Sequence, residues 1–252
     1  MSNSPLVSYT RLSPNHSGQR THSIDRITPH CVVGQCTVEA LGDIFLPASR
    51  KASSNYGIGA DGRIGMYVEE NNRSWCSSDE ANDQRAVTIE CASDDTEPYA
   101  FNDVVYNKLV ELCIDICKRN GKTKLLWLGD KTKTLNYTPK SDEMVLTVHR
   151  WFASKSCPGD WMYERLECLA KEVTDALTET PLDNKAADWS KNEVNWALRN
   201  SILKGDERGD LMLHSPVTRE QFCVMLKRYH DLIYPPQLNK SQKTVENNSR
   251  IL

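Results

Sequence analysis

The segment RITPHCVVG, residues 26–34, decides the fold that this sequence predicts. It alternates in polarity and is rich in β-branched residues, which is typical of a β-strand, and we expect the strand to end near His30. The run AVTIECA, residues 86–92, predicts a second strand. Both runs are predicted strands of the main domain.

Predicted strands and helices alternate along the chain as far as residue 177. The predicted helices span residues 37–46, 101–120 and 160–177, with Thr37 as a cap and Gly121 as a stop. Residues 55–68 predict two strands joined by a turn at Asp61-Gly62. Residues 124–130 predict one more strand. This alternation favours a layered α/β domain over a helical bundle.

The pattern changes after residue 177. We expect an N-terminal arm at 1–22, a main domain at 23–179, a polar linker at 180–188, a small helical unit at 189–234 and a disordered polar tail at 235–252. Within the small unit, helices are predicted near residues 192–200 and 218–234. A chain of 252 residues suits one full domain and a small second one.

Composition excludes several classes of partner. The net charge is −3 with both signs interspersed, which argues against a nucleic-acid partner. No run of about 18 apolar residues exists, so we expect no membrane insertion. The N-terminus has no apolar stretch typical of a signal peptide. We therefore expect synthesis in the cytoplasm, and any export by another route.

The nine cysteines are expected to be reduced thiols, because their number is odd and no signal peptide precedes them. Most should be small buried side chains. Cys113 and Cys117 lie four residues apart in a helical pattern, so they share one helix face. We interpret that pair as core packing, because no second ligand pair lies nearby in the sequence.

The segment LTVHRWFASKSCPGD, residues 146–160, places His149 eight residues before Cys157. Imidazole and thiolate are zinc ligands, and a catalytic zinc has three protein ligands and one open position. His30 is the best third ligand by elimination, since the other four histidines lie in the N-terminal arm or the C-terminal unit. The alternative is a buried cysteine beside an exposed histidine, because this spacing is not a standard zinc-finger interval.

A zinc-bound water would need a general base and a group that stabilises an oxyanion. Glu90 ends the apolar run AVTIE, an unusual place for a carboxylate unless it faces a cavity or has a partner. Lys155 lies two residues before Cys157. The alternatives are a strand-end carboxylate in a structural salt bridge and a solvated loop lysine.

Four segments, in order, carry a family resemblance: THSIDRITPHCVVGQCTVEALGDIF, SSNYGIGADGRIGMYVEENNRSW, NDQRAVTIECA and VHRWFASKSCPGDW. They resemble the zinc-dependent N-acetylmuramoyl-L-alanine amidases, the type-2 amidase family that includes the peptidoglycan recognition proteins. The likeness runs from about residue 23 to 177 and looks closest to endolysins and autolysins of clostridia-like bacteria and their phages. It implies a mixed central sheet flanked by helices.

The resemblance implies roles for individual residues. His30, His149 and Cys157 match the ligands of one catalytic Zn²⁺, Glu90 matches the catalytic glutamate, and Lys155 matches the lysine that stabilises the oxyanion. The implied reaction cleaves the amide between the lactyl group of N-acetylmuramic acid and L-alanine in bacterial peptidoglycan.

Other residues of the motif segments are implied to line or support the substrate cleft. Members that lack the glutamate often use a tyrosine two residues before the position of Tyr56, but Ser54 stands there in this sequence. Tyr56 therefore fits as a residue lining or supporting the cleft. Trp75, Asn82 and Trp151 are implied to line the glycopeptide groove, and ordinary packing is the alternative for the tryptophans.

The C-terminal segment DWSKNEVNWALRNSILKGDERGDLMLHSPVTREQFCVMLKRY resembles one S-layer homology motif. The likeness lies in Trp189, Trp196, Gly205 and Thr218-Arg219-Glu220. It implies binding of secondary cell-wall polysaccharide through Trp189 and Arg219. A single copy also leaves open a homo-oligomer formed through this unit, or a helical hairpin docked on the main domain.

The resemblance as a whole implies an endolysin or autolysin that acts on the cell wall. Without a signal peptide, holin-mediated or lytic release would deliver it. Two alternatives remain open: a peptidoglycan-binding module without catalysis, and another zinc hydrolase on the same fold.

Overall fold

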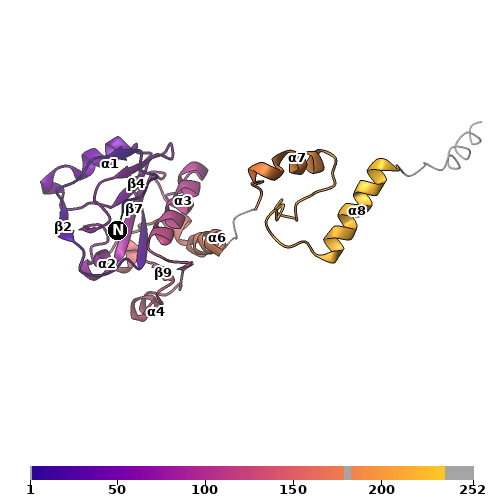
Figure 1. Cartoon of the computed structure of the whole chain (residues 1–252). Helices are drawn as coiled ribbons and strands as arrows, with labels where there is room; N and C mark the ends of the chain where they lie inside the picture. The colour runs from indigo at the N-terminus through magenta and orange to yellow at the C-terminus, as the bar shows by residue number, and fades with distance from the viewer. Residues whose placement is uncertain (1, 179–182, 236–252) are drawn as a thin grey trace, which may run out of the picture. The chain divides into compact units, whose positions relative to one another are not determined.

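The computed structural model describes residues 2–178 and 183–235 of the 252-residue chain. The chain divides into two compact units between residues 179 and 180. Figure 1 shows the helices and strands of the N-terminal and the C-terminal unit. None of the described helices is both long and apolar enough to cross a membrane.

The N-terminal unit is built around a seven-stranded sheet with the strand order β1-β5-β4-β7-β3-β9-β8. Its strands are β1 (Tyr9–Thr10), β3 (Arg26–Cys31), β4 (Tyr56–Ile58), β5 (Ile64–Met66), β7 (Ala86–Cys91), β8 (Lys124–Leu126) and β9 (Glu143–Leu146). β4 and β5 are antiparallel, and the other neighbouring strands are parallel. β2 (His16–Gln19) and β6 (Asn72–Ser74) form a separate antiparallel pair. The sheet is mixed, as predicted.

Helices flank this sheet. They are α1 (Val38–Phe45), α2 (Glu80–Arg85), α3 (Asp103–Arg119), α4 (Lys131–Asn136), α5 (Asp160–Tyr163) and α6 (Leu166–Thr178), with the short 3-10 helices η1 (Ala48–Arg50) and η2 (His149–Trp151). α3 and α6 pack against each other and contribute Leu109 and Leu169 to the main apolar core. α1 contributes Leu41 and Phe45 to a second, smaller apolar cluster. The α/β class predicted from the alternating pattern is therefore correct.

The central strands β3 and β7 separate apolar from polar side chains by simple alternation. Ile27 and Cys31 of β3 lie in the main core, as do Val87, Ile89 and Cys91 of β7. The alternate positions are polar and lie toward the opposite face: Thr28 and His30 on β3, and Thr88 and Glu90 on β7. One face of these strands therefore makes the core, and the other carries polar groups to the strand ends.

The N-terminal residues, whose packing the sequence left open, are part of the main unit. β1 extends the sheet beside β5, and β2 pairs with β6. Arg20 is buried, and its guanidinium donates to the carbonyl oxygens of Glu70 and Asp83 and to Asn55 Oδ1. This one side chain ties the N-terminal segment to the loops around the polar face.

A buried ion pair joins this unit across long sequence distances. Glu70 is fully buried, and its carboxylate accepts hydrogen bonds from the Tyr56 hydroxyl (2.7 Å) and from Arg119 Nη1 (2.8 Å). Arg119 lies at the end of α3 and also binds Asp115 one turn earlier (2.8 Å). These charged groups are desolvated, so each depends on the other.

The C-terminal unit contains η3 (Asp188–Ser190), α7 (Lys191–Arg199) and α8 (Arg219–Ile233). Thr218 and Gln221 form a reciprocal capping box at the start of α8. A Cβ on Gly205 would lie 2.6 Å from the Gly209 backbone, so the turn between the helices requires glycine there. Asp183 accepts from the His214 backbone and side chain, so this unit begins before the predicted boundary at residue 189.

Most predicted elements are confirmed with small shifts. Thr37 caps α1 by accepting from the Ala40 amide (3.2 Å), and the strand pair at 55–68 is β4 and β5. Two predictions were too long: β8 covers only 124–126 of the predicted 124–130, and the predicted helix 160–177 is broken into α5 and α6. The predicted tail from residue 235 lies almost wholly outside the described residues, as do residues 180–182 of the predicted linker.

Glu70→Ala should lower the free energy of unfolding by about 1–3 kcal/mol, because the buried Tyr56 hydroxyl and the Arg119 guanidinium both lose the carboxylate that accepts their hydrogen bonds. Urea denaturation followed by circular dichroism measures this loss. Glu39→Ala is the matched control, since Glu39 pairs with Arg63 at the surface (2.6 Å) and should cost much less. Equal losses in the two variants would contradict a structural role for the buried pair.

Candidate active site

The register of β3 on β7 places His30 beside Glu90. The two strands are parallel and paired residue for residue, with Thr28 opposite Thr88 and His30 opposite Glu90. Because each pair lies at the same point of the alternation, both side chains leave the sheet on its polar face. The imidazole and the carboxylate are therefore neighbours at the carboxyl ends of two central strands.

A short, braced segment brings His149 and Cys157 to the same place. His149 begins η2, and the Arg150 amide donates to the Cys157 carbonyl oxygen (3.1 Å). The Arg150 side chain also binds the Ser156 carbonyl (Nε–O 3.1 Å) and Asp160 (2.9 Å). These bonds close the loop, so the eight-residue separation in sequence becomes proximity in space.

Gly159, in the Pro-Gly pair that follows Cys157, is required by the backbone conformation and by a close contact. Its φ is +83°, and a Cβ there would lie 2.6 Å from the Pro98 carbonyl oxygen. Only glycine meets both conditions without displacing the backbone. The glycine therefore lets the chain turn from Cys157 directly into α5.

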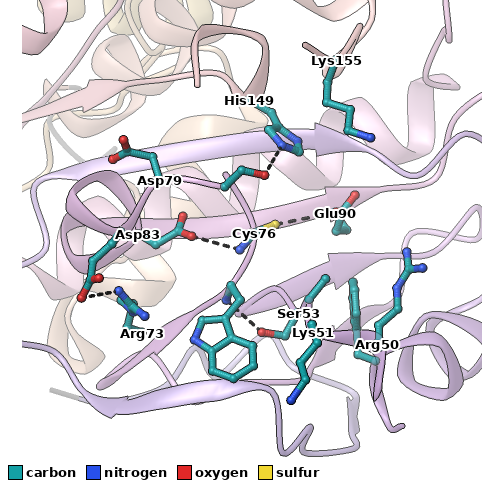
Figure 2. A pocket seen from close by; sticks show the side chains of 15 residues that line it. Arg50, Lys51, Ser53, Arg73, Cys76, Asp79, Asp83, Glu90, His149 and Lys155 are labelled. Carbon is teal, nitrogen blue, oxygen red and sulfur yellow. Dashed lines mark hydrogen bonds and ion pairs between the residues drawn. The ribbon is translucent and has the colours of Figure 1, made fainter. Parts of the chain in front are cut away.

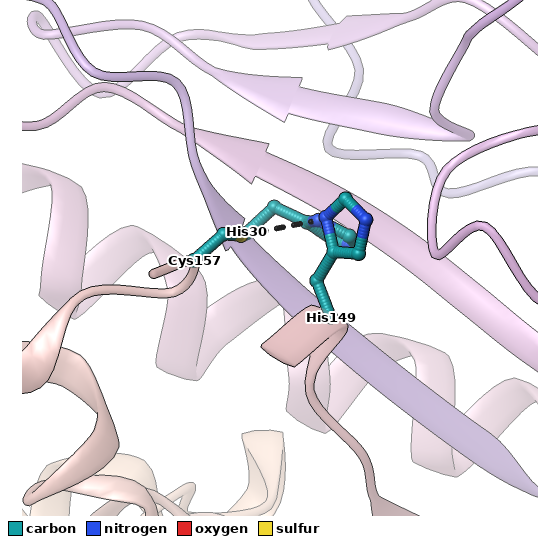
Figure 3. Close-up of side chains that lie close together, drawn as sticks. All are labelled: His30, His149 and Cys157. Atoms are coloured by element: carbon teal, nitrogen blue, oxygen red, sulfur yellow. Dashed lines mark hydrogen bonds between the residues drawn. The ribbon is translucent and has the colours of Figure 1, made fainter. Parts of the chain in front are cut away.

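The three predicted ligands converge. Ligand atoms of His30, His149 and Cys157 lie within 4.8 Å of one another, and the two imidazole rings are 5.0 Å apart between centroids. Figure 3 shows Cys157 Sγ directed at His30 Nδ1, a distance of 3.3 Å. Two nitrogens and one sulfur form a donor set that zinc accepts in tetrahedral geometry.

The protonation states of the two histidines suit a metal ion. Burial lowers the pKa of His30, and the neighbouring His149 lowers it further, so the ring is neutral at physiological pH. Burial, followed by Lys155, also lowers the pKa of His149. His30 Nε2 is buried and has no hydrogen-bond partner among the described residues. A neutral imidazole with an unsatisfied buried nitrogen fits a ligand better than a structural histidine.

Ser78 orients the second histidine. Its hydroxyl lies 3.1 Å from His149 Nε2, which leaves Nδ1 of that ring without a hydrogen bond within the described ranges. Hydrogen bonds of this kind set the tautomer and angle of ligating histidines. The sequence analysis did not identify Ser78, because a serine in a polar loop carries no recognisable signal.

Glu90 is held in a desolvated setting. Burial raises the pKa of its carboxyl group to about 7. Among the described residues, only the Cys76 thiol donates a hydrogen bond to this carboxylate (Sγ–Oε1 3.7 Å). No salt bridge neutralises it within the described part of the chain, so the structural alternative considered for Glu90 does not apply. A carboxylate with a pKa near 7 is suited to general-base chemistry at neutral pH.

Two pockets, of about 410 and 270 Å³, meet at this site and share Arg50, Glu90, His149 and Lys155 in their linings. Figure 2 shows Lys155, His149 and Glu90 around the larger pocket, with Arg50 on its other side. Lys155 makes no ion pair with any described residue, so its ammonium group is free to meet a bound ligand. Arg50 was not identified from the sequence, since η1 has no periodic pattern.

Asp83 holds the loop between β6 and α2 in place through hydrogen bonds to its backbone. Its carboxylate accepts from the backbone amides of Cys76 (3.0 Å) and Ser77 (3.2 Å), and burial raises its pKa to about 6. Asp79 caps α2 by accepting from the Asn82 amide (2.7 Å). The loop is thereby fixed with Cys76 against Glu90 and Ser78 against His149.

The remaining predicted substrate residues fall into two groups. Trp75 lines the larger pocket, as expected for a groove residue. Tyr56 and Asn82 are fully buried and Trp151 is 8% exposed, so these three do not line either pocket. They act inside the fold: Tyr56 binds Glu70, Asn82 accepts from Arg26 (3.1 Å), and Trp151 stacks on Trp127 at 5.1 Å.

Both residues predicted to bind wall polymer are available to solvent. Trp189 is 87% exposed in η3, and Arg219 is exposed at the first position of α8. Neither has a side-chain hydrogen bond or ion pair to another described residue.

Comparison with known proteins identifies a family match. The model of the family described as N-acetylmuramoyl-L-alanine amidase matches residues 16–160. This span is more than half of the chain and contains His30, Glu90, His149, Lys155 and Cys157. No curated protein sequence matches the chain.

Several solved structures are similar in part. A mutant endolysin from Bacillus subtilis is 14% identical and matches 66% of this chain and 97% of its own, with a TM-score of 0.43. An endolysin N-acetylmuramoyl-L-alanine amidase from Clostridium intestinale is 15% identical, with 64% and 93% covered and a TM-score of 0.41. The hydrolase AmiA of Staphylococcus aureus, in complex with its ligand, is 13% identical, with 66% and 82% covered and a TM-score of 0.46. The family assignment rests on the sequence match and not on these scores.

The raised pKa of Glu90 predicts a pH-dependent stability difference in metal-free protein. Between pH 4.5 and about 7, Glu90 is protonated in the native state and ionised in the unfolded state, so native stability falls as pH rises. Glu90→Gln lacks this loss and should gain up to about 3 kcal/mol relative to wild type over that interval. Urea denaturation in chelator at pH 4.5 and 7.5 measures it, with the exposed Glu167→Gln as control. A difference independent of pH would contradict the desolvated carboxylate.

Proposed function

The chain belongs to the N-acetylmuramoyl-L-alanine amidase family, and from this we propose that it hydrolyses the amide between the lactyl group of N-acetylmuramic acid and L-alanine in bacterial peptidoglycan. The observation that carries the proposal is the convergence of His30, His149 and Cys157 beside Glu90 and Lys155 in an open pocket. This set contains metal ligands, a base and a cation in one place.

We infer that the three ligands hold one Zn²⁺ ion. The donor set, the neutral histidines and the unpartnered His30 nitrogen fit such an ion. A bound zinc supplies Lewis acidity toward the amide carbonyl and lowers the pKa of a coordinated water to about 7. Burial keeps the Cys157 thiol protonated in the free protein, so loading the site displaces that proton to solvent.

Glu90 moves the protons of the reaction. Its carboxylate takes the proton of the attacking water and delivers it to the departing amine of L-alanine. A pKa near 7 allows one group to act first as base and then as acid at neutral pH. The Cys76 thiol holds one carboxylate oxygen, which leaves the other for the water.

Lys155 stabilises the negative charge that develops on the carbonyl oxygen. Its ammonium group has no ion-pair partner in the described part of the chain. Lys155 lines both pockets and lies two residues before Cys157. A cation placed in a partly desolvated site is worth more than the same charge in water. Trp75 offers an aromatic surface for the glycopeptide in the larger pocket.

We propose that the C-terminal unit, whose residues 189–234 resemble an S-layer homology motif, retains the enzyme on the wall by binding secondary cell-wall polysaccharide. The solvent-exposed Trp189 and Arg219 support this, because stacking and a free guanidinium suit an anionic sugar. The enzyme would then act as an endolysin or autolysin, reaching the wall after holin-mediated or lytic release.

The reaction is tested on purified Gram-positive peptidoglycan with and without a zinc chelator. Chelator-sensitive release of L-alanine amino termini, without new reducing sugar ends, is the expected result. His30→Ala and Cys157→Ser should lose both bound zinc and activity. New reducing ends would mean a glycosidase, and no new ends would favour a binding module.

Two further variants separate the roles of the base and the cation. Glu90→Gln should keep zinc and lower kcat by about 100- to 10,000-fold, and Lys155→Met by about 100- to 1,000-fold. The exposed residues Glu167 and Lys171 give matched controls, Glu167→Gln and Lys171→Met, which should retain the wild-type rate. An unchanged kcat in Glu90→Gln would remove Glu90 from the mechanism.

Arg219→Ala should weaken retention on wall that carries its secondary polysaccharide, while turnover of soluble muropeptide stays the same. Sedimentation with wall stripped of that polymer gives the reference. Arg199→Ala, an exposed arginine of α7, is the matched control. Equal retention of the two variants on both kinds of wall would contradict a wall-binding role for Arg219.

A further inference from the structure

Cys76 contacts the catalytic carboxylate but is not among the proposed zinc ligands. We propose that Cys76, Glu90 and His30 form a second, weaker site for a thiophilic divalent cation, whose occupation stops hydrolysis by engaging Glu90. The inhibitory consequence rests on the proposed amidase function, whereas the binding itself does not.

The donor geometry fits an ion. One ligand atom from each of His30, Cys76 and Glu90 lies within 4.8 Å of the other two. Cys76 Sγ and Glu90 Oε1 are 3.7 Å apart. Zinc–sulfur and zinc–oxygen bonds of about 2.3 and 2.1 Å at a tetrahedral angle place the two atoms about 3.6 Å apart. The pair is therefore already spaced as two ligands of one ion.

The second set is distinct from the first. The two sets share only His30, and neither His149 nor Cys157 belongs to the second. An imidazole that gives up its N–H proton can bind a metal ion through each ring nitrogen, so one histidine can bridge two ions. His30 is 1% exposed, so its ring is held inside the fold beside both sets of donors.

Cys76 is held in place by the backbone and is open to the pocket. Asp83 accepts from the Cys76 amide (3.0 Å), which fixes the loop without using the thiol. Cys76 and Glu90 both line the larger pocket, so an ion can reach them from solvent. Figure 2 shows Asp83, Cys76 and Glu90 in line, joined by these two hydrogen bonds.

Occupation of this site would replace the Cys76–Glu90 hydrogen bond by three metal bonds. The Cys76 thiol proton and the His30 N–H proton leave to solvent. The thiolate, the Glu90 carboxylate and the second His30 ring nitrogen bind the ion, and no redox change occurs. A carboxylate oxygen bound to a cation no longer accepts the proton of water, so the general base is lost. A single thiolate with carboxylate and imidazole favours soft or borderline ions such as Cd²⁺ and Zn²⁺ over Mg²⁺.

The test counts ions with Cd²⁺ as the probe. Metal-free full-length protein is titrated by calorimetry and by the ultraviolet absorption of cadmium thiolate bonds. Wild type should bind two ions, and Cys76→Ser and Glu90→Gln should each bind one. Cys168→Ser, which removes an exposed thiol of α6, should still bind two. One ion in wild type, or two in Cys76→Ser, would overturn the proposal.

Activity gives a second readout. For each protein, the rate of hydrolysis is first measured with one equivalent of zinc. It is then measured with zinc in excess, and the two rates are compared. Wild type and Cys168→Ser should lose at least about tenfold in rate, while Cys76→Ser should keep its starting rate. Equal inhibition of Cys76→Ser would overturn the inhibitory role. If no hydrolysis is seen at all, the proposed function fails, and the ion count still decides the second site.

Discussion

The parallel, residue-for-residue pairing of β3 with β7 is the constraint on which the rest of the site depends. It places His30 and Glu90 side by side at the carboxyl ends of two central strands. The alternation of the strands sends Ile27 and Val87 into the core and the two functional groups to the opposite face. A shift of one residue in this register would exchange the two faces, so the apolar core and the site stabilise the same pairing.

The polar face is costly to bury, and a hydrogen-bonded network offsets that cost. Asn55 binds the backbone and side chain of Thr88 (3.2 and 3.3 Å), and Thr28 shares a hydrogen bond with Thr147 (2.7 Å). Arg20 closes this network from the N-terminal segment. Among the described residues, His30 Nε2 has no hydrogen-bond partner and Glu90 accepts only from the Cys76 thiol. These two groups are therefore left able to bind an ion and to accept a proton.

Much of this arrangement could be predicted from the sequence, because it depends on short-range patterns. Period-two alternation gave both central strands, and ordered motifs gave His30, Glu90, His149, Lys155 and Cys157, which the structure brings to one place. Residues that act through tertiary contacts could not be found this way. In the sequence Cys76 resembles any other cysteine, and its role depends on Asp83, seven residues later, holding the loop. Asn82 and Trp151 lie in the right motifs, but the local pattern does not reveal which way a side chain of a buried segment points.

The account's central claim is that two imidazoles and one thiolate from separate segments bind a single ion. Zinc K-edge X-ray absorption of the full-length protein, loaded with one equivalent of zinc, tests it most directly. We predict one sulfur neighbour at about 2.3 Å, with nitrogen and oxygen neighbours at about 2.0–2.1 Å. The sulfur contribution should be absent in Cys157→Ser and present in Cys168→Ser. A spectrum with only nitrogen and oxygen neighbours in the wild-type protein, or no retained zinc, would contradict the claim.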